Sequence, residues 1–490
     1  MKSNFQFHQY ASDNPDLASS FGQDDDVSLT DHFFRHGVRE MRGINPEDYM
    51  RLEAVICSQK GHVYLAGWAD RRIIQDFHVS IEIGYMRYDF DEIDICWYHR
   101  PDVSVVTGDD LSANGFLAIC QIPEPVLHAR MLIYINNRPV HHTGQARFSS
   151  VDRFLQQALA ACAVLADKPV GTSLAHAQTL LEPFRNLWQD VLRQMTFTCA
   201  FQHRGNDPVD RSIIITIYRK ADMLLMQLQA LAQFLSTTGT EVVVVGNDLQ
   251  GTGLLVEQLK AFCQIHDIRL SLHVCSGNSG FSAGNNHGAQ VARGDVLIFM
   301  NPDVFPPAHD PQQAFAFLES DPGEALHGAL LYYGDGLLMH SGMYTTGDQV
   351  FDERTGESHT VLRVEHFGKG LSHHIEEAAL DGVMDACAGQ PVLVSAALWK
   401  IRKSTFFALG GLPTDYIFAY YEDADFCLKA LAAGHAVVVD ETSRWIHMEG
   451  VGKATPPAVR SFMWLNRALY SRRFAESPFV VGVTEDLSLL

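Results

Sequence analysis

The chain has 490 residues, more than a single hydrophobic core usually serves, so we expect two or three domains. Apolar residues make up 47% of the chain, while 58 acidic against 37 basic residues give a formal net charge of −21. This charge argues against binding to nucleic acid or to anionic membrane surfaces, because no local run of basic residues offsets it.

Two further features bear on the cellular compartment. The nine cysteines are scattered without a C-x-x-C pair, which favours reduced, mostly buried thiols over a zinc site or a redox dithiol. The start MKSNFQFHQYASDNPDL lacks an apolar core of signal-peptide length, and no stretch approaches the ~20 apolar residues that span a bilayer. We therefore expect a cytoplasmic protein, and peripheral association with the inner face of the membrane stays open.

The amino-terminal part divides by its hydrophobic periodicity. Residues 1–49 form a polar, partly helical segment, and we expect its first thirty residues, which include the acidic run Asp24 to Asp26, to be poorly ordered. Residues 50–148 alternate apolar and polar side chains in short runs between turn formers, which predicts a β-sandwich accessory domain. Residues 149–208 change to an apolar spacing of three to four, which predicts a helical connector.

Residues 209–475 alternate predicted strands and helices. Continuous apolar runs, such as EVVVVG at 241–246 and VLIFM at 296–300, are separated by amphipathic helices. This pattern is typical of a mostly parallel sheet that is covered on both faces. The sequence thus predicts an α/β domain with a Rossmann-like sheet and a tail at 476–490, and in such a sheet ligands bind beyond the carboxyl ends of the strands.

Polar residues follow four of these predicted strands: Arg219; Asn247 with Asp248; the stretch 276–289; and Asn301-Pro302-Asp303. The glycine-rich part, Gly280 to Gly288, opens a predicted helix, where backbone N–H groups attract anions, although a plain strand-to-helix turn would look the same. Asp303 suits a hard cation at the sheet edge, or else an Asx turn around the proline.

A second polar cluster lies further along the chain. The aromatic run Tyr416 to Tyr421 leads into a predicted helix whose first turn carries Glu422, Asp423 and Asp425. These acids could serve a reaction, or could stabilise the helix dipole by up to ~1 kcal/mol. His447 follows the next predicted strand, where a single histidine is more often structural.

In order and spacing these segments resemble the inverting, metal-dependent family 2 glycosyltransferases of GT-A fold, particularly rhamnosyl- and galactofuranosyltransferase-like members. The resemblance covers about residues 209–455 and is most specific in GNSGFSAGNNHGAQVARGDVLIFMNPDV (277–304) and GGLPTDYIFAYYEDADFCLKALAAG (410–434). More loosely, three segments are similar to the helical segment and β-sandwich found beside some polysaccharide-synthesis glycosyltransferases. They are His32 to Gly43, Gly67 to Asp70, and Arg100 to Val103.

The resemblance implies roles by position. Asp423 would be the general base, with Glu422 beside it orienting the acceptor. Asp303, completed by His447, would hold Mn²⁺ or Mg²⁺. The implied donor-binding residues are Thr216, Tyr218, Arg219, Asn247, Asp248, Asn278, Gly280, Asn285, Asn286 and Asn301. The aromatic residues that could stack on acceptor sugars, or equally belong to the core, are Tyr420, Tyr421 and Trp445, with Phe418 in the same run.

Three positions depart from the family pattern. Gly246 stands where the family has an acid that contacts the base, Thr216 replaces a common proline, and Asn301 replaces the first acid of the metal site. Because metal binding would then depend on Asp303, His447 and the diphosphate, we expect it to be weak.

The expected function is metal-dependent, inverting transfer of a sugar from a UDP-, dTDP- or GDP-linked donor to a hydroxyl of a glycan or lipid-linked acceptor, in cell-surface polysaccharide synthesis. One alternative is a non-catalytic relative that binds glycan or a partner enzyme. A nucleotidyltransferase is a third reading, which leaves Glu422 and Asp423 unexplained. Homo-oligomer formation stays open, and nucleic acid is not an expected partner.

Overall fold

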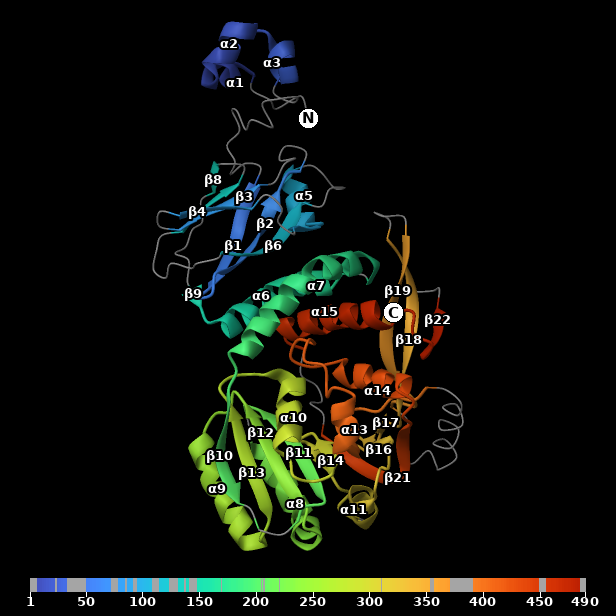
Figure 1. The fold of residues 1–490 in the computed structure, drawn as a ribbon. Coiled ribbons are helices and arrows are strands. Elements are labelled where there is room, and N and C mark those ends of the chain that lie inside the picture. The colour runs from blue at the N-terminus through green and yellow to red at the C-terminus, as the bar shows by residue number, and fades with distance from the viewer. Residues whose placement is uncertain are drawn as a thin grey trace. The chain divides into compact units, whose positions relative to one another are not determined.

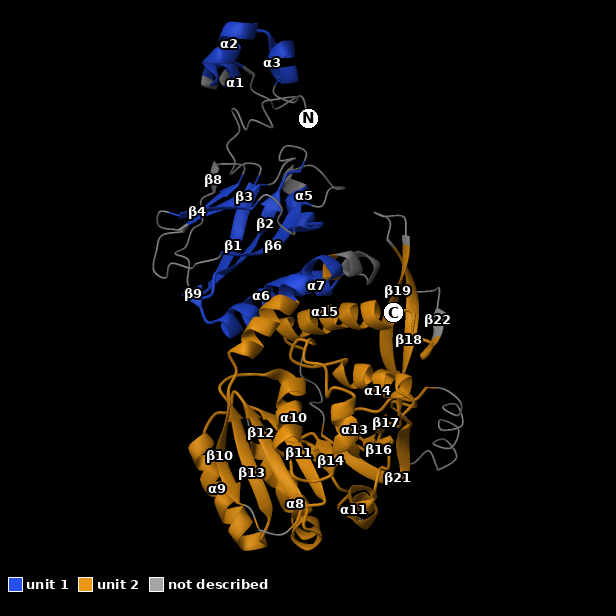
Figure 2. Cartoon of the chain, in the orientation of Figure 1, with its two compact units in different colours: residues 1–168, 178–184 blue, residues 169–177, 185–490 orange. Residues whose placement is uncertain are grey.

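The computed structural model describes residues 7–22, 24–32, 50–71, 78–83, 86–90, 95–107, 114–122, 131–135, 138–140, 148–168, 170–203, 205, 208–219, 221–309, 311–352, 357–370, 391–448 and 455–484. The chain divides into two compact units (Figure 2). Unit 1 comprises residues 1–168 and 178–184, and unit 2 comprises residues 169–177 and 185–490. Each unit is built around a hydrophobic cluster of its own.

Unit 1 begins with three short helices, α1 (Phe7–Asp13), α2 (Pro15–Phe21) and α3 (Asp26–His32). They bury Tyr10, Leu17 and Leu29, and the Asp25 carboxylate accepts the Ser28 N–H at 2.9 Å at the start of α3. Asp25 of the acidic run thus caps α3, and the expectation of poor order in the first thirty residues stays a prediction. The motif that begins at His32 lies outside the described residues from position 33 on.

Two mainly antiparallel sheets follow in unit 1, in the orders β5-β6-β2-β1-β9 and β4-β3-β7-β8. Val63 and Leu65 of the first sheet and Ile81 and Ile133 of the second belong to one buried cluster, as expected of two sheets packed face to face. The elements are β1 (Met50–Ser58), β2 (His62–Ala69), β3 (Val79–Ile83), β4 (Met86–Phe90), β5 (Ile95–Tyr98), α5 (Pro101–Thr107), β6 (Gly115–Gln121), β7 (Met131–Ile135), β8 (Arg138–Val140) and β9 (Phe148–Ser149).

The segment predicted as a helical connector is helical only in part. It contains α6 (Val151–Ala166) and α7 (Val170–Arg193), but residues Phe197–His203 form strand β10, which pairs antiparallel with β13 (Arg269–Cys275). The sequence FTCAFQH alternates too briefly to show this beside two long helices. The last two turns of α7, from Arg185, belong to unit 2.

The main sheet of unit 2 has ten strands in the order β10-β13-β12-β11-β14-β20-β16-β21-β15, with β17 paired to β16 (Figure 1). Strands β13, β12, β11 and β14 are parallel, and their continuous apolar runs are buried, which confirms the predicted α/β fold. The strands are β11 (Arg211–Tyr218), β12 (Glu241–Asn247), β14 (Val296–Met300), β15 (Val304–Phe305), β16 (Leu326–Tyr332), β17 (Leu338–His340), β20 (Leu398–Arg402) and β21 (Val437–His447).

Helices and a small sheet complete unit 2. Helix α10 packs on β11 and β12, and α15 packs on β19 of a separate sheet, β19-β18-β22. Strand β22 lies in the segment predicted as a tail. The elements are α8 (Asp222–Thr238), α9 (Thr252–His266), α10 (Gly280–Val291), α11 (Pro311–Glu319), α13 (Lys403–Ala408), α14 (Glu422–Ala432), α15 (Pro457–Phe474), β18 (Met343–Asp352), β19 (Glu357–His366) and β22 (Val480–Thr484).

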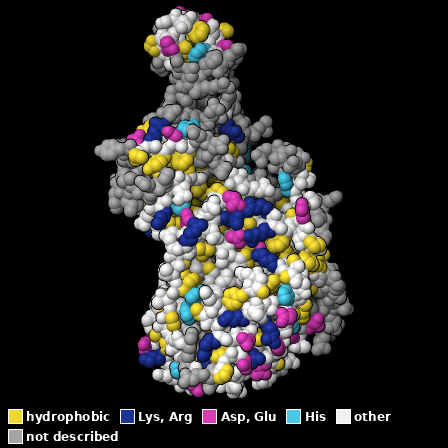
Figure 3. Space-filling model, viewed as in Figure 1, with side chains coloured by type: hydrophobic (Ala, Val, Ile, Leu, Met, Phe, Trp, Pro, Cys, Tyr) yellow, Lys and Arg dark blue, Asp and Glu magenta, His cyan; other side chains and the backbone are white. Residues whose placement is uncertain are grey.

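Surface properties agree with the composition. Within the described ranges, no helix is long and apolar enough to cross a bilayer. On the face drawn in Figure 3, the Lys and Arg side chains of unit 2 lie interspersed with Asp and Glu. Every described cysteine except Cys199 is buried, as predicted.

Candidate active site

The ends of β11 and β12 present an exposed group of three side chains. Arg219 Nε lies 2.9 Å from Asp248 Oδ2, and the Arg219 guanidinium lies over the Tyr218 ring at 4.8 Å. Both Arg219 and Asp248 have positive φ, +62° and +47°, which non-glycine residues adopt at a cost and mostly at functional sites. An exposed aromatic face beside a paired base and acid could stack on a planar ring and bond its edge.

Asn247, next in the chain to Asp248, is buried in the turn that leads into α10. Its Nδ2 donates to the Gly280 carbonyl at 2.9 Å, and its Oδ1 accepts from the Ser279 hydroxyl at 2.7 Å. This side chain is 2% exposed and its amide holds the turn, so the donor-binding role of Asn247 stays a prediction. Thr216 of β11, which pairs with Val245 of β12, has a buried hydroxyl without a hydrogen-bond partner among the described residues.

The glycine-rich stretch lies inside α10, which begins at Gly280, and does not form a loop before the helix. A Cβ at Gly288 would lie 2.5 Å from Ile214 Cγ2, and one at Gly284 would lie 2.9 Å from Thr216 Cγ2. Gly280 has φ +73°, and a Cβ there would meet the Phe418 carbonyl oxygen at 2.6 Å. These glycines therefore allow α10 to pack closely on β11 and on the aromatic run.

The asparagines of α10 hold the protein backbone. Asn286 donates from Nδ2 to the Leu412 carbonyl at 2.8 Å and accepts the Leu412 N–H at Oδ1 at 2.9 Å. Asn285 is 2% exposed and donates to the Phe281 carbonyl. Asn278 accepts the Gly280 N–H at 3.0 Å. The amides of Asn285 and Asn286 thus hold the protein backbone, and their donor-lining role stays a prediction.

Asp303 and His447 lie in contact although 144 positions separate them. Strand β15 pairs with β21 so that Val304 faces His447, and this pairing brings Asp303 Oδ1 to 3.1 Å from His447 Nε2. His447 Nδ1 lies 3.0 Å from Met339 Sδ, which leaves Nε2 directed to the carboxylate. The Asp303 side chain is 28% exposed, so the pair is open to a ligand.

The loop that carries Asp303 is held from two sides. Gln227 of α8 is fully buried and donates to the carbonyls of Asn301 and Val304, both at 2.6 Å. The Asn301 N–H donates to the Ala397 carbonyl at 2.8 Å. Gln227 escaped sequence analysis, because an amide within a helix carries no sign of the loop it will hold.

Asp423 lies in the first turn of α14. Its Oδ1 accepts the Ala424 N–H at 2.8 Å and its Oδ2 accepts the Ala396 N–H at 3.3 Å. Burial raises the pKa of Asp423, against the lowering effect of these N–H groups and of the Ser395 hydroxyl. Burial and the neighbouring Asp423 raise the pKa of Glu422 well above its usual value, and Glu422 Oε2 has no partner among the described residues.

Residues 396 and 397 connect these two groups. Ala396 donates to Asp423, and Ala397 accepts from Asn301 in the loop of Asp303. In the structure Asp303 touches His447, and Asp423 is joined to the loop of Asp303 through the adjacent residues Ala396 and Ala397.

The aromatic run is held in an unusual backbone conformation. Phe418, Tyr420 and Tyr421 have φ of +59°, +79° and +72°. Asn466 of α15 holds the run by accepting the Ile417 N–H at 2.9 Å and donating to the Ala419 carbonyl at 2.8 Å. Such strain persists only where surrounding contacts enforce it.

The aromatic candidates for acceptor binding have different surroundings. Tyr420 is 46% exposed, while Tyr421 is half-buried and packs on Tyr470 with ring centroids 5.2 Å apart. Trp445 is fully buried in the core, and its Nε1 donates to the Ser443 hydroxyl at 2.8 Å. Trp445 therefore lies in the core, the alternative that the sequence left open, and Tyr420 is the exposed ring.

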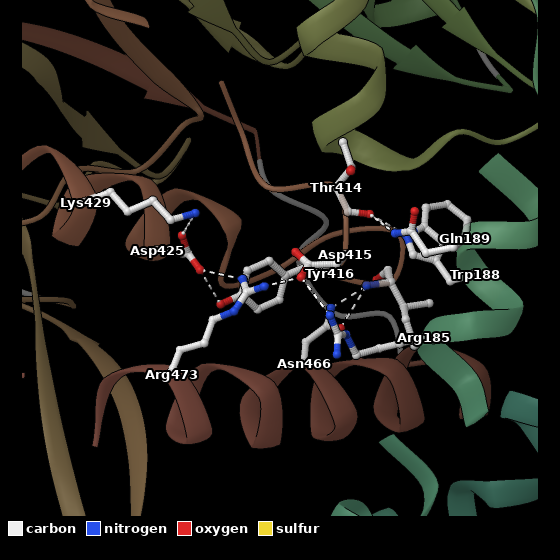
Figure 4. A network of polar contacts seen from close by, with 11 residues as sticks. Arg185, Trp188, Gln189, Thr414, Asp415, Tyr416, Asp425, Lys429, Asn466 and Arg473 are labelled. Atoms are coloured by element: carbon white, nitrogen blue, oxygen red, sulfur yellow. Dashed lines mark hydrogen bonds and ion pairs between the residues drawn. The ribbon is translucent and has the colours of Figure 1, made fainter. Parts of the chain in front are cut away.

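A polar network fixes the segment that precedes the aromatic run (Figure 4). Asp425 is fully buried and bonds Tyr416 Oη at 2.9 Å and Arg473 Nη1 at 2.8 Å, and it pairs with Lys429 Nζ at 2.6 Å. Of the three acids at the start of α14, Asp425 is thus committed to structure. On the other side, Trp188 Nε1 donates to the Thr414 carbonyl at 2.9 Å.

Comparison with known proteins identifies part of unit 2. Residues 212–350 match the model of glycosyl transferase family 2. An uncharacterised protein of Sinorhizobium fredii, y4gI, is 27% identical over 215 residues, which are 44% of this chain and 22% of that protein. The chain thus matches about a fifth of the length of this relative.

Solved structures of glycosyltransferases align with the chain at low similarity. GalNAc-T7 with UDP, GalNAc and Mn²⁺ is 14% identical over 51% of this chain and 47% of that one, with a TM-score of 0.34. The mannosyltransferase PcManGT from Pyrobaculum calidifontis, with GDP-Man and Mn²⁺, is 13% identical over 66% and 88%, also with a TM-score of 0.34. S. aureus TarS 1–349 is 16% identical over 49% and 60%, with a TM-score of 0.32. Scores this low do not establish a common fold by themselves. The family match covers residues 212–350, from β11 into β18, so this part of unit 2 carries a glycosyl transferase family 2 domain.

Proposed function

We propose that the chain transfers a sugar from a nucleotide diphosphate to a hydroxyl of a glycan or lipid-linked acceptor, with inversion at the anomeric carbon, as a step of cell-surface polysaccharide synthesis. The observation that carries this proposal is the joint attachment of Asp423 and of the Asp303 loop to residues 396 and 397. A base for the acceptor and an anchor for the diphosphate are thereby set in one rigid frame.

The exposed group at the ends of β11 and β12 is the proposed nucleotide site. The Tyr218 ring would stack on the base, and Asp248 and Arg219 would bond its edge and the ribose. This placement agrees with the rule that ligands of open α/β sheets bind beyond the carboxyl ends of the strands. Asp248 would take over the base contact that Gly246 cannot make.

Asp303 and His447 fit a divalent cation. One carboxylate oxygen and one imidazole nitrogen suit Mn²⁺ or Mg²⁺, which complete their coordination with phosphate oxygens and water. No group of three or more His, Cys, Asp or Glu side chains suited to a metal occurs in the described part of the chain. The bound metal would neutralise charge on the departing diphosphate.

Asp423 would accept the proton of the acceptor hydroxyl as that oxygen attacks the anomeric carbon from the face opposite the leaving group. Its raised pKa makes it a stronger base than an ordinary aspartate. Glu422 would bond the acceptor beside it, and Tyr420 would support the sugar ring. Holding donor and acceptor in line would supply much of the remaining acceleration.

Donor hydrolysis and nucleotide binding test the proposal without knowledge of the acceptor. We expect slow hydrolysis of at least one sugar in a panel of UDP-, dTDP- and GDP-sugars with Mn²⁺ or Mg²⁺, and calorimetric binding of the matching nucleotide diphosphate. Arg219→Ala should weaken that binding about 10-fold, the effect of one lost charge-assisted hydrogen bond.

Arg402→Ala is the matched control, because Arg402 also forms a partly exposed ion pair, with Asp321, but lies at the other end of the sheet core in β20. It should leave nucleotide affinity unchanged. Absence of binding by every nucleotide would refute enzymatic transfer and favour a glycan- or partner-binding module.

A further inference from the structure

Residues 394–397, just before β20, contact both halves of the proposed site. The Val394 N–H donates to Cys427 Sγ of α14 at 3.4 Å, and the Ala396 N–H donates to Asp423 Oδ2. The Ala397 carbonyl accepts from Asn301. The orientation of these peptide groups therefore decides how Asp423 is held relative to the Asp303 loop.

Between these anchors, the Ser395 N–H is held by a histidine. His340, the last residue of β17, is 1% exposed, and its Nε2 lies 3.3 Å from the Ser395 nitrogen. Since a peptide N–H can only donate, Nε2 must be the acceptor, and neutral His340 then carries its proton on Nδ1. His366 of β19 lies 3.1 Å away through its own Nδ1 and can accept that proton's hydrogen bond.

The surroundings keep His340 neutral. Burial, with the nearby His366, Lys369 and His447, lowers the pKa of His340 well below its usual value. Burial also lowers the pKa of His366 to about 4. Both rings are therefore neutral at pH 7. The Ser395 N–H then donates to His340 Nε2, and His340 Nδ1–H donates to His366 Nδ1.

The neighbouring residue on β17 reaches the metal pair. Met339 Sδ contacts His447 Nδ1 at 3.0 Å, while His340 holds Ser395. Two adjacent side chains of one short strand thus support the imidazole of the metal pair and the segment that binds the base.

We propose that His340 is a positioning residue for the transfer reaction: by accepting the Ser395 N–H it aims the next peptide N–H, that of Ala396, at the Asp423 carboxylate, and His366 fixes the tautomer that can do so. This inference rests on the proposed function. The ionisable groups that act on or beside Asp423 are Glu422, Asp425 and Cys427 of α14 and Tyr470 of α15. None of them would be altered by a change at His340.

The test compares His340→Leu, which cannot accept a hydrogen bond, with His340→Gln, whose Oε1 can lie near the position of Nε2. In His340→Leu we expect kcat to fall about 10- to 100-fold with the donor KM unchanged. The acid limb of the kcat profile should move to higher pH, because Asp423 loses a donor to its ionised form. His340→Gln should recover most of kcat and the original acid limb.

Two further variants complete the design. His366→Leu, at a half-buried position, removes the acceptor for His340 Nδ1 and should reproduce the shift more mildly, which keeps the test open if His340→Leu does not fold. His435, a half-buried histidine of the same unit that bonds the Glu324 carbonyl, serves as control through His435→Leu, which should leave kcat and the acid limb unchanged.

Hydrogen exchange of the peptide that spans residues 393–398 gives a readout that is independent of turnover. We expect the Ser395 and Ala396 amides to exchange faster in His340→Leu. Failure of the proposed function would appear as an inactive wild type. Unchanged exchange in folded His340→Leu, or an unchanged acid limb and kcat in an active enzyme, would overturn the inference, as would equal losses in the Leu and Gln variants.

Discussion

Asp423 and Asp425 lie two positions apart at the start of α14, and their environments predict opposite effects of the same substitution. Asp425 is fully buried and bonded by Tyr416 and Arg473, with Lys429 paired to its other oxygen. Asp423 instead accepts backbone N–H groups of Ala396 and Ala424 and forms no ion pair among the described residues. Asp→Asn at each position therefore distinguishes a carboxylate that stabilises the fold, Asp425, from the proposed general base, Asp423.

Asp425→Asn should destabilise unit 2 by about 3 kcal/mol. Removing one partner of a buried pair costs roughly 3–5 kcal/mol. The lower end applies here, because Arg473 keeps Asp415 and Lys429, which is 41% exposed, can return to water. At roughly 2–4 °C of Tm per kcal/mol in a domain of this size, the melting temperature should fall by about 6–12 °C.

Asp423→Asn should leave Tm nearly unchanged and abolish turnover. The variant loses one hydrogen bond worth about 1 kcal/mol, but removes a charge that burial disfavours, as the raised pKa shows. Loss of the general base should cost about 10²- to 10⁴-fold in kcat with donor affinity retained. Thermal melting, nucleotide calorimetry and sugar transfer measure the two variants side by side. A fall of Tm in Asp423→Asn equal to that in Asp425→Asn would refute the division of roles.

Three further predictions use the same assays. Glu422→Gln should raise Tm at pH 8, and the gain should shrink toward pH 4.5. The raised pKa of Glu422 means that the folded state binds the proton more tightly than the unfolded state does. The wild type therefore loses stability as pH rises from the unfolded pKa through the folded pKa. Asp303→Ala should weaken calorimetric nucleotide binding only when Mn²⁺ is present, and equal loss without metal would contradict its role as a ligand. Trp188→Phe keeps an aromatic ring against Phe418 but removes the hydrogen-bond donor to the Thr414 carbonyl. Loss of about 1 kcal/mol should lower Tm by about 2–4 °C. An unchanged Tm would show that the segment at Thr414 does not depend on α7.

Periodicity alone was enough to predict the parallel strands of the main sheet. Runs such as EVVVVG and VLIFM are buried along their whole length, and in a parallel sheet this leaves one arrangement of strands with helices on both faces. The brief strand β10 and the capped α3 were missed, because their signals are short and depend on partners elsewhere: β13 for the strand and the buried Leu29 for the helix.

Residue type predicted the candidate site less well than strand order did. Asparagines at a strand end and a helix start suggest ligand contacts, yet Asn247 and Asn286 use their amides to hold Gly280 and Leu412. The same ambiguity applies to aromatic residues: Trp445 is in the core and Tyr420 is exposed, although both lie near carboxylates in the sequence. The type of a side chain shows which groups it can bond. Whether its amide bonds a ligand or a backbone group of the protein depends on the fold.

Asp303 and His447 show what the sequence could not provide. Their 3.1 Å contact depends on β15 pairing with β21, a two-residue strand against the end of an eleven-residue one. A shift of this register by one residue would turn either side chain to the other face of the sheet. Gln227 in turn holds this register, because it bonds both ends of the 301–304 loop. The contact between Asp303 and His447 thus depends on a side chain of helix α8, which carries none of the proposed site residues. The geometry of the proposed site therefore depends on buried amides and peptide groups as well as on the acids and imidazoles of the sequence motifs.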